Sequence, residues 1–85
     1  MQKIKMFSTN ICPFCVAAKQ LIKKLGLEFE EVNLEADPEL RMQLSRENGG
    51  WRTVPMIFIG DEFIGGFQEL TKLHSAGELM DKVNT

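Results

Sequence analysis

The chain has 85 residues, of which 44% are hydrophobic and 26% charged, and its formal net charge is −2. This length allows a single domain, residues 1–85, with one modest core that needs neither a metal nor a disulfide framework. Lys and Arg form no long block and no apolar run approaches the length of a membrane span, so neither a nucleic-acid nor a membrane partner is expected.

The first predicted elements are a strand and a helix, separated by a turn that contains both cysteines. Residues 3–7 have a strand pattern, and from Pro13 to Leu25 apolar side chains recur every three or four residues, as on one face of an amphipathic helix. Pro13 suits the first helical position because its missing N–H would have no partner there. Gly26 suits the position just after the helix. Cys12 is therefore predicted at or next to the N-cap.

The motif Cys12-Pro13-Phe14-Cys15 places two thiols one helical turn apart, close enough for a disulfide. At the N-cap, the Cys12 sulfur can accept hydrogen bonds from the amides of Phe14 and Cys15, and it lies at the positive end of the helix dipole, so a thiolate is favoured. A structural zinc site takes about four Cys or His ligands, whereas the chain has two Cys and one His. No metal is therefore expected. A structural staple is a third interpretation, but so short a loop contributes little stability.

The beginning of the chain, residues 1–5, lacks the apolar stretch of a secretory signal peptide. We therefore expect a cytoplasmic protein, in a compartment where thiols are kept reduced and a disulfide is usually catalytic or transient. This setting favours a redox pair over the two other interpretations of the cysteines.

The rest of the chain predicts three more strands and two more helices. Alternation of apolar and polar residues predicts a strand over 29–34. The triplet Asp37-Pro38-Glu39 has the N-cap, proline and acidic residue of a helix start, and Asn48-Gly49-Gly50 follows its end. The remaining predictions are a strand at 56–59, a hairpin connection at 60–62, a returning strand from 63, a break at Gly65-Gly66 and a last helix from Phe67 that reaches Leu79 with an interruption at Gly77.

The predicted order, β-α-β-α-β-β-α, describes one α/β domain. A right-handed βαβ unit followed by a hairpin and a closing helix gives a four-stranded mixed sheet flanked by helices on both faces. Ligands on such sheets bind at the carboxyl ends of the parallel strands. Because Cys12 follows the first strand, we expect the functional site at that end.

Three motifs, in this order and at these separations, resemble the glutaredoxins of the small dithiol class: Cys12-Pro13-Phe14-Cys15, Thr53-Val54-Pro55 and Gly65-Gly66. The resemblance spans essentially the whole chain and implies a thioredoxin-like fold. It also implies a glutathione-dependent thiol–disulfide oxidoreductase, with Cys12 as the nucleophile and Cys15 as the resolving thiol. The Val54–Pro55 bond is then expected to be cis.

The resemblance further implies a set of residues that bind substrate and glutathione. The amides of Gly66, Phe67 and Gln68, at a helix N-terminus, would receive the γ-glutamyl carboxylate, and Arg41 would receive the glycine carboxylate. The backbone of Val54 would pair with the cysteinyl part in the manner of an added strand. The complete implied set is Phe14, Arg41, Thr53, Val54, Pro55, Gly66, Phe67 and Gln68.

The chain departs from the family pattern at several positions. Thr9 replaces a lysine that often precedes the first cysteine by three residues, Gln68 replaces a frequent aspartate, and Trp51 is unusual. These differences concern the affinity for glutathione more than the chemistry. Trp51 is interpreted either as a packed loop anchor or as the rim of the binding site. Arg41 is either a ligand contact or a solvated helix residue.

Glutathione is the implied co-substrate, with no metal, and the implied partners are glutathionylated or disulfide-containing proteins. A monomer is expected. Two alternatives stay open. A redoxin of this type can instead receive its electrons from thioredoxin reductase. The second alternative is an iron–sulfur cluster held between two chains by Cys12 and glutathione, although the rigid Pro13 leaves little room for it.

Overall fold

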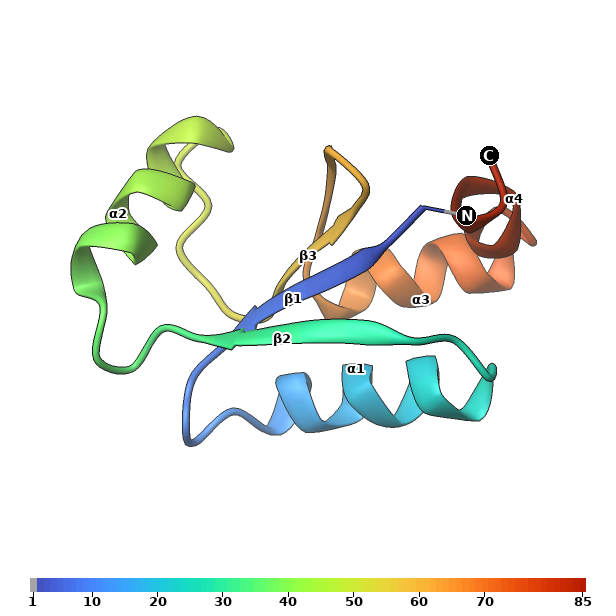
Figure 1. The fold of residues 1–85 in the computed structure, drawn as a ribbon, viewed down its shortest axis with the longest axis horizontal. Helices are drawn as coiled ribbons and strands as arrows, with labels where there is room; N and C mark the ends of the chain where they lie inside the picture. The colour runs from blue at the N-terminus through green and yellow to red at the C-terminus, as the bar shows by residue number, and fades with distance from the viewer. Residues whose placement is uncertain (1) are drawn as a thin grey trace.

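Strand β1 (Ile4–Ser8) is an inner strand of the sheet in the computed structural model, which describes residues 2–85 (Figure 1). The strand order is β2-β1-β3-β4, with β2 at Phe29–Asn33, β3 at Met56–Ile59 and β4 at Glu62–Gly65. β1 pairs in parallel with β2 and antiparallel with β3, and β3 pairs antiparallel with β4. The predicted four-stranded mixed sheet is confirmed; Met1 of the predicted domain lies outside the described residues.

Helices cover both faces of this sheet (Figure 1). α1 (Pro13–Lys24) and α3 (Phe67–Ser75) lie on one face, and α2 (Pro38–Glu47) lies on the other. The predicted interruption of the last helix is complete, because Gly77 has φ 74° and a separate short helix, α4 (Leu79–Val83), follows it.

The core consists of two apolar clusters, one on each face of the sheet. The cluster under α1 and α3 contains Ile4, Met6, Ala18, Ile22, Leu27, Ile57, Ile59, Leu70, Leu79 and Val83. The cluster under α2 contains Phe7, Leu34, Leu44 and Met56. Side chains of β1 alternate between the two faces, as expected for a strand buried on both sides. Apolar clusters therefore pack on both faces of β1, and they fix the position at which the turn that leads to Cys12 begins.

Local chemistry explains where the helices begin and end. Cys12 is the N-cap of α1 and Pro13 its first residue, while Gly26, with φ 73°, follows its C-cap. In α2, the Asp37 carboxylate accepts a hydrogen bond from the Leu40 amide at 3.1 Å. The side chains of Cys12 and Asp37 accept hydrogen bonds from N–H groups of the first helical turn that have no partner within the helix. Pro13 has no N–H that would need a partner there, and Gly26 adopts the positive φ that ends a helix.

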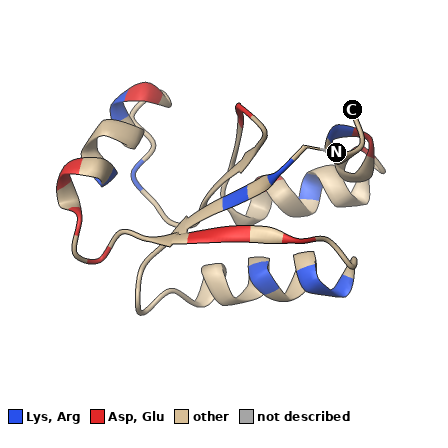
Figure 2. Cartoon of the chain, viewed as in Figure 1, with Lys and Arg blue, Asp and Glu red and all other residues tan. Residues whose placement is uncertain are grey.

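Strand β2 is acidic and is flanked by lysines from β1 and α1 (Figure 2). The Glu31 carboxylate of β2 accepts a hydrogen bond from Ser8 Oγ at 2.6 Å and forms an ion pair with Lys19 Nζ at 3.0 Å. Ser8 is fully buried. The Ser8 hydroxyl, and after it the Lys19 ammonium, hold the pKa of Glu31 below its usual value, while burial opposes them. Glu30, beside it, pairs with Lys3 at 2.8 Å on the exposed surface.

Gln2, the first described residue, lies next to the last residues of the chain, beside α4 (Figure 1). The Gln2 amide donates a hydrogen bond to the Val83 carbonyl at 2.6 Å, and the Gln2 side chain donates one to the Thr85 carbonyl at 3.2 Å. In Figure 1 this end of the molecule is opposite α2 and opposite the start of α1.

Candidate active site

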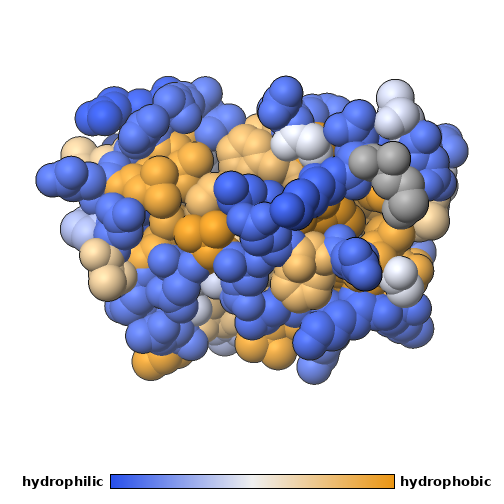
Figure 3. Space-filling view, viewed as in Figure 1, coloured by the Kyte–Doolittle hydropathy of each residue, from blue (hydrophilic) through white to orange (hydrophobic). Residues whose placement is uncertain are grey.

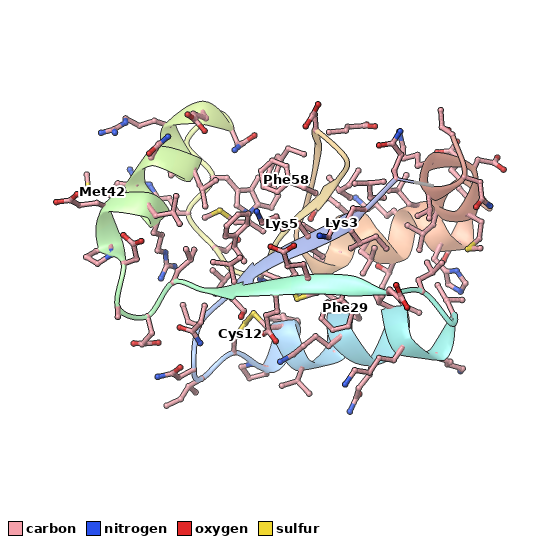
Figure 4. The ribbon with its side chains drawn as sticks, viewed as in Figure 1. Lys3, Lys5, Cys12, Phe29, Met42 and Phe58 are labelled. Atoms are coloured by element: carbon pink, nitrogen blue, oxygen red, sulfur yellow. A yellow bond between two sulfur atoms is a disulfide. The ribbon has the colours of Figure 1, made fainter. Side chains whose placement is uncertain are left out.

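Cys12 and Cys15 form a disulfide at the start of α1, with their Cα atoms 5.1 Å apart (Figure 4). Cys12 has an extended backbone, and its sulfur accepts a hydrogen bond from the Cys15 amide at 3.1 Å. Of the two amides predicted to reach this sulfur, that of Cys15 makes the bond. The helix dipole and this amide both stabilise negative charge on Cys12 when the disulfide is opened.

The two cysteine residues differ in their exposure to solvent. Cys15 is 2% exposed and Cys12 is 8% exposed, so both residues are mostly covered and Cys12 is the more accessible. The first turn of α1 has no acidic side chain that would repel a thiolate. Thiol–disulfide exchange with a molecule from solvent is therefore more favourable at Cys12. The Cys15 thiol is placed to attack a mixed disulfide formed on Cys12.

A groove of about 320 Å³ lies beside the disulfide turn. Three segments line it: the first turn of α1, the connection before β3, and the junction of β4 with α3. The predicted binding residues on its walls are Phe14, Thr53, Val54, Pro55, Gly66, Phe67 and Gln68. The Val54–Pro55 peptide bond is cis. The groove has the size of a small-molecule site, and it adjoins the disulfide because Phe14 separates the two cysteines in the chain.

Aromatic side chains form much of the groove wall. Phe14 stacks on Phe67 with ring centroids 6.2 Å apart, and Trp51 packs edge-on against Phe63 at 5.3 Å. Trp51 packs against the cluster under α2, as a loop anchor would, and it also lines the groove, as a residue of the rim would. Within residues 2–85, Trp51 Nε1 is a buried donor without a hydrogen-bond partner.

The start of α3 gives the groove its backbone donors. Gly66 is the N-cap, and its amide donates to the Glu69 carboxylate at 2.9 Å. This internal bond removes Gly66 from the three amides predicted to receive an anion and leaves those of Phe67 and Gln68. Glu69 lines the groove and was missed by the sequence analysis. Its position three residues after the N-cap is the available signal, because an acid there commonly returns to the N-cap amide.

Arg41 lies apart from the other predicted binding residues. It lines a neighbouring depression of about 410 Å³ that also contains Thr9 and Ile11. Its Nη2 donates a hydrogen bond to the Arg52 carbonyl at 3.0 Å, next to Thr53 of the groove. The structure therefore brings seven of the eight predicted residues together and places Arg41 at the border.

Within residues 2–85, no three His, Cys, Asp or Glu side chains gather in an arrangement that could hold a metal ion. No helix in that range has the length and apolar character needed to cross a membrane.

Comparisons with known proteins agree with this geometry. The fold is thioredoxin-like, and a disulfide at a helix N-terminus, next to a groove that a cis-proline lines, defines the class of thiol–disulfide oxidoreductases. The sequence model of the glutaredoxin family matches residues 4–64. A glutaredoxin of Pseudomonas aeruginosa is 40% identical over 79 residues, which are 93% of this chain and 93% of that protein. The chain belongs to the glutaredoxin family.

Solved structures of the family superpose on the chain. The buckwheat glutaredoxin–glutathione complex has a TM-score of 0.90 and 30% identity, covering 98% of this chain and 77% of that one. The solution structure of glutaredoxin from Brucella melitensis has a TM-score of 0.86 and 36% identity, covering 100% of this chain and 94% of that one. The predicted thioredoxin-like fold and the predicted family are both confirmed.

Proposed function

We propose that the protein uses glutathione to reduce glutathione mixed disulfides and protein disulfides through Cys12 and Cys15. The observation that carries this proposal is the groove next to the disulfide, whose walls contain seven of the residues expected to bind glutathione. The buckwheat relative with the same fold was solved as a complex with glutathione.

For a mixed disulfide, the Cys12 thiolate attacks the glutathionyl sulfur. A bond forms between Cys12 and glutathione, the bond between glutathione and the protein breaks, and the protein thiolate leaves and takes a proton from water. A second glutathione thiolate then attacks the glutathione sulfur held on Cys12. Oxidised glutathione departs and the Cys12 thiolate is restored. Each mixed disulfide therefore consumes one molecule of free glutathione, because the other half of the oxidised glutathione comes from the substrate.

For a protein disulfide, Cys12 attacks one sulfur of the substrate and Cys15 resolves the resulting mixed disulfide. Cys15 is close enough for this step, since the two residues already form a disulfide. The reduced substrate leaves, and the Cys12–Cys15 bond remains for two glutathione molecules to reduce.

The groove has donors suited to the parts of glutathione. The amides of Phe67 and Gln68, at the N-terminus of α3, receive the γ-glutamyl carboxylate. Thr53, Val54 and Pro55 line the stretch where the cysteinyl backbone lies.

The glycine carboxylate of glutathione is assigned to Arg41. A guanidinium has five N–H donors, and the bond from Nη2 to the Arg52 carbonyl uses one of them. The remaining donors are available to a carboxylate that extends from the groove toward Thr9. Because Thr9 carries no positive charge, Arg41 has to provide this contact without a lysine.

We further propose that the protein acts as a monomer in the cytoplasm, with glutathionylated or disulfide-containing proteins as its partners. A reducing compartment keeps the pool of glutathione that the reaction consumes.

The test is turnover of a glutathione mixed disulfide by the wild type, Cys12→Ser and Cys15→Ser. Cys12→Ser is expected to be inactive because it lacks the attacking sulfur. Cys15→Ser is expected to retain activity on this substrate and to lose it on protein disulfides. An active Cys12→Ser variant contradicts the proposal.

The electron donor is tested separately, by coupling the wild type to glutathione with its reductase and, in parallel, to thioredoxin reductase. We expect turnover with glutathione. Reduction by thioredoxin reductase alone would assign the protein to the alternative redoxin type.

A further inference from the structure

The loop between β1 and α1, residues 9–11, is mostly exposed. Ile11 is 92% exposed and Asn10 is exposed as well, whereas Cys12, the next residue, is 8% exposed. Figure 3 shows apolar atoms uncovered at the lower left edge of the molecule, where this loop lies. Burial of the loop therefore does not explain how Cys12 is held at the N-cap of α1.

Hydrogen bonds connect this loop to the end of β2 and to the loop that follows it. The Asn10 amide donates to Glu35 Oε1 at 3.0 Å, and Asn33 Nδ2 donates to Asn10 Oδ1 at 2.9 Å. The Glu35 amide donates to Asn33 Oδ1 at 2.8 Å. These bonds form a closed ring of Asn10, Asn33 and Glu35, which we call the loop clasp. In the described part of the chain, the hydrogen bonds of residues 9–11 all involve Asn10.

Both halves of the Asn33 side-chain amide are used in the clasp. A backbone N–H has to meet the oxygen of this amide, so the Glu35 N–H fixes Oδ1 on its own side and turns Nδ2 toward Asn10. Asparagine commonly accepts such a bond from the residue two positions later. The same side chain therefore shapes its own loop and binds the other one.

The clasp extends the pairing of β1 with β2. Ser8 lies opposite Asn33 in the parallel register, and the Leu34 amide donates to the Ser8 carbonyl at 2.7 Å. In Figure 1 the two loops leave this same end of the sheet, one toward α1 and the other toward α2. Main-chain pairing ends here, and the side chains of the clasp continue the connection. The loop that leads to Cys12 is thereby tied to the sheet.

We propose that Asn33 is a positioning residue, which through the loop clasp keeps Cys12 at the N-cap of α1 when the disulfide is open. The proposal rests on the proposed function, in which the Cys12 thiolate is the attacking group. In the oxidised protein the bond to Cys15 restrains Cys12. In the reduced protein this restraint is gone, and the clasp is the contact that continues to hold the loop.

Loss of the clasp should raise the pKa of the Cys12 thiol in the reduced protein. The Cys15 amide, which donates to the Cys12 sulfur at 3.1 Å, and the helix dipole stabilise the thiolate only while Cys12 keeps its N-cap conformation. A loop that frays spends part of its time with the sulfur away from both, so the thiolate fraction falls. A residue with a merely structural role would lower the stability of the fold and leave this pKa unchanged.

The charged side chains around the disulfide turn lie in the depression, in the groove and beside the second turn of α1. They are Glu35, Arg41, Glu69, Lys19 and Glu31. A neutral substitution at Asn33 leaves their number unchanged. A change in the reactivity of Cys12 therefore reports the position of its sulfur and not the loss or gain of a neighbouring charge.

The experiment measures the rate at which iodoacetamide alkylates Cys12 as a function of pH, in protein with the background substitution Cys15→Ser. Cys12 is then the single thiol, and neither glutathione nor a substrate takes part. For Asn33→Ala we expect the profile to move to higher pH. The rate one pH unit below the midpoint of the parent protein should be lower by about threefold.

The double variant Asn10→Ala/Asn33→Ala distinguishes a shared contact from two separate effects. Asn10 and Asn33 act through one bond between their side chains. The double variant should therefore move the profile no further than Asn33→Ala alone. A sum of two separate shifts would overturn the clasp as the cause.

Asn48→Ala is the matched control. The Asn48 side chain also makes one hydrogen bond, to the Leu44 carbonyl at 2.8 Å, but at the opposite end of α2 from the clasp. This variant should lose a comparable amount of stability in urea unfolding and leave the alkylation profile of Cys12 unchanged. Circular dichroism verifies that all variants are folded.

The outcomes separate this proposal from the proposed function. An alkylation profile that Asn33→Ala leaves unchanged overturns the clasp, even where the variant is less stable, and leaves the proposed function intact. An equal shift in Asn48→Ala also overturns it, since the effect would then be a general one. A wild type that fails to turn over a glutathione mixed disulfide contradicts the proposed function, while the alkylation profiles still decide whether Asn33 positions Cys12.

Discussion

Ser8→Ala should destabilise the protein in a pH-dependent manner. Ser8 is fully buried and donates to the Glu31 carboxylate at 2.6 Å, so the substitution removes a hydrogen bond to a charged group. Such bonds contribute about 1.5–3 kcal/mol. Glu31 keeps its ion pair with Lys19, and its side chain is 34% exposed, so water compensates in part. We therefore expect a loss of about 1.5 kcal/mol at pH 7 and a Tm lower by about 6–12 °C.

The sign of the pH dependence follows from the pKa of Glu31, which is lowered in the folded protein, with the Ser8 hydroxyl as the largest cause. A lowered pKa stabilises the fold above the unfolded pKa of about 4.3, and this contribution is lost as the pH falls through the folded pKa. In Ser8→Ala the pKa of Glu31 in the folded protein is lowered less than in the wild type. The difference in unfolding free energy between wild type and variant should therefore shrink from pH 7 to pH 3.

The assay is urea unfolding at pH 7, 5 and 3, followed by the fluorescence of Trp51, the chain's single tryptophan. Glu30→Gln is the control, because Glu30 pairs with Lys3 on the exposed surface of the same strand. Exposed pairs contribute little, so this variant should change stability less than Ser8→Ala. A Ser8→Ala difference that is equal at pH 3 and pH 7 would refute the charge-assisted bond.

Substitutions at Gly65, Gly66 and Asp37 test the backbone before α3 and the N-cap of α2. Gly65 has φ 120°, and a Cβ there would lie 2.8 Å from Glu69 Cγ, so Gly65→Ala should cost about 1–3 kcal/mol in a urea titration. Gly66 meets nothing closer than 3.5 Å, so Gly66→Ala should leave stability nearly unchanged; an equal loss for both glycines would contradict this assignment of strain. Asp37→Ala removes the N-cap of α2 and should cost about 1 kcal/mol, whereas Asp37→Asn should largely restore it; equal losses would argue against the cap.

Local chemistry in the sequence was sufficient to predict the disulfide turn and the helix starts. The positions of Cys12, Pro13 and Asp37 depend on capping and backbone geometry that a few neighbouring residues determine. The groove could not be predicted in this way. Pro55 and Gly66 are far from Cys12 in the chain, and only the topology brings their segments together, so their prediction required the family resemblance.

Contacts that depend on exact packing remained beyond sequence analysis. The bond between Ser8 and Glu31 requires the register in which Ser8 lies opposite Asn33. The internal bond from the Gly66 amide to Glu69 reduces the anion site by one donor, although a residue-by-residue resemblance predicted three. Arg41 was predicted from the same resemblance and is turned toward the Arg52 carbonyl at the border of the site.

The meeting of Gln2 with Val83 and Thr85 has a practical consequence for handling the protein. An affinity tag, a fluorophore or a tether to an electrode can be fused at either terminus and will emerge beside α4, opposite the start of α1 (Figure 1). The reactive sulfurs then face the solution whichever terminus is anchored. Electrochemical measurements on an immobilised layer should therefore give the same exchange kinetics for both orientations of attachment.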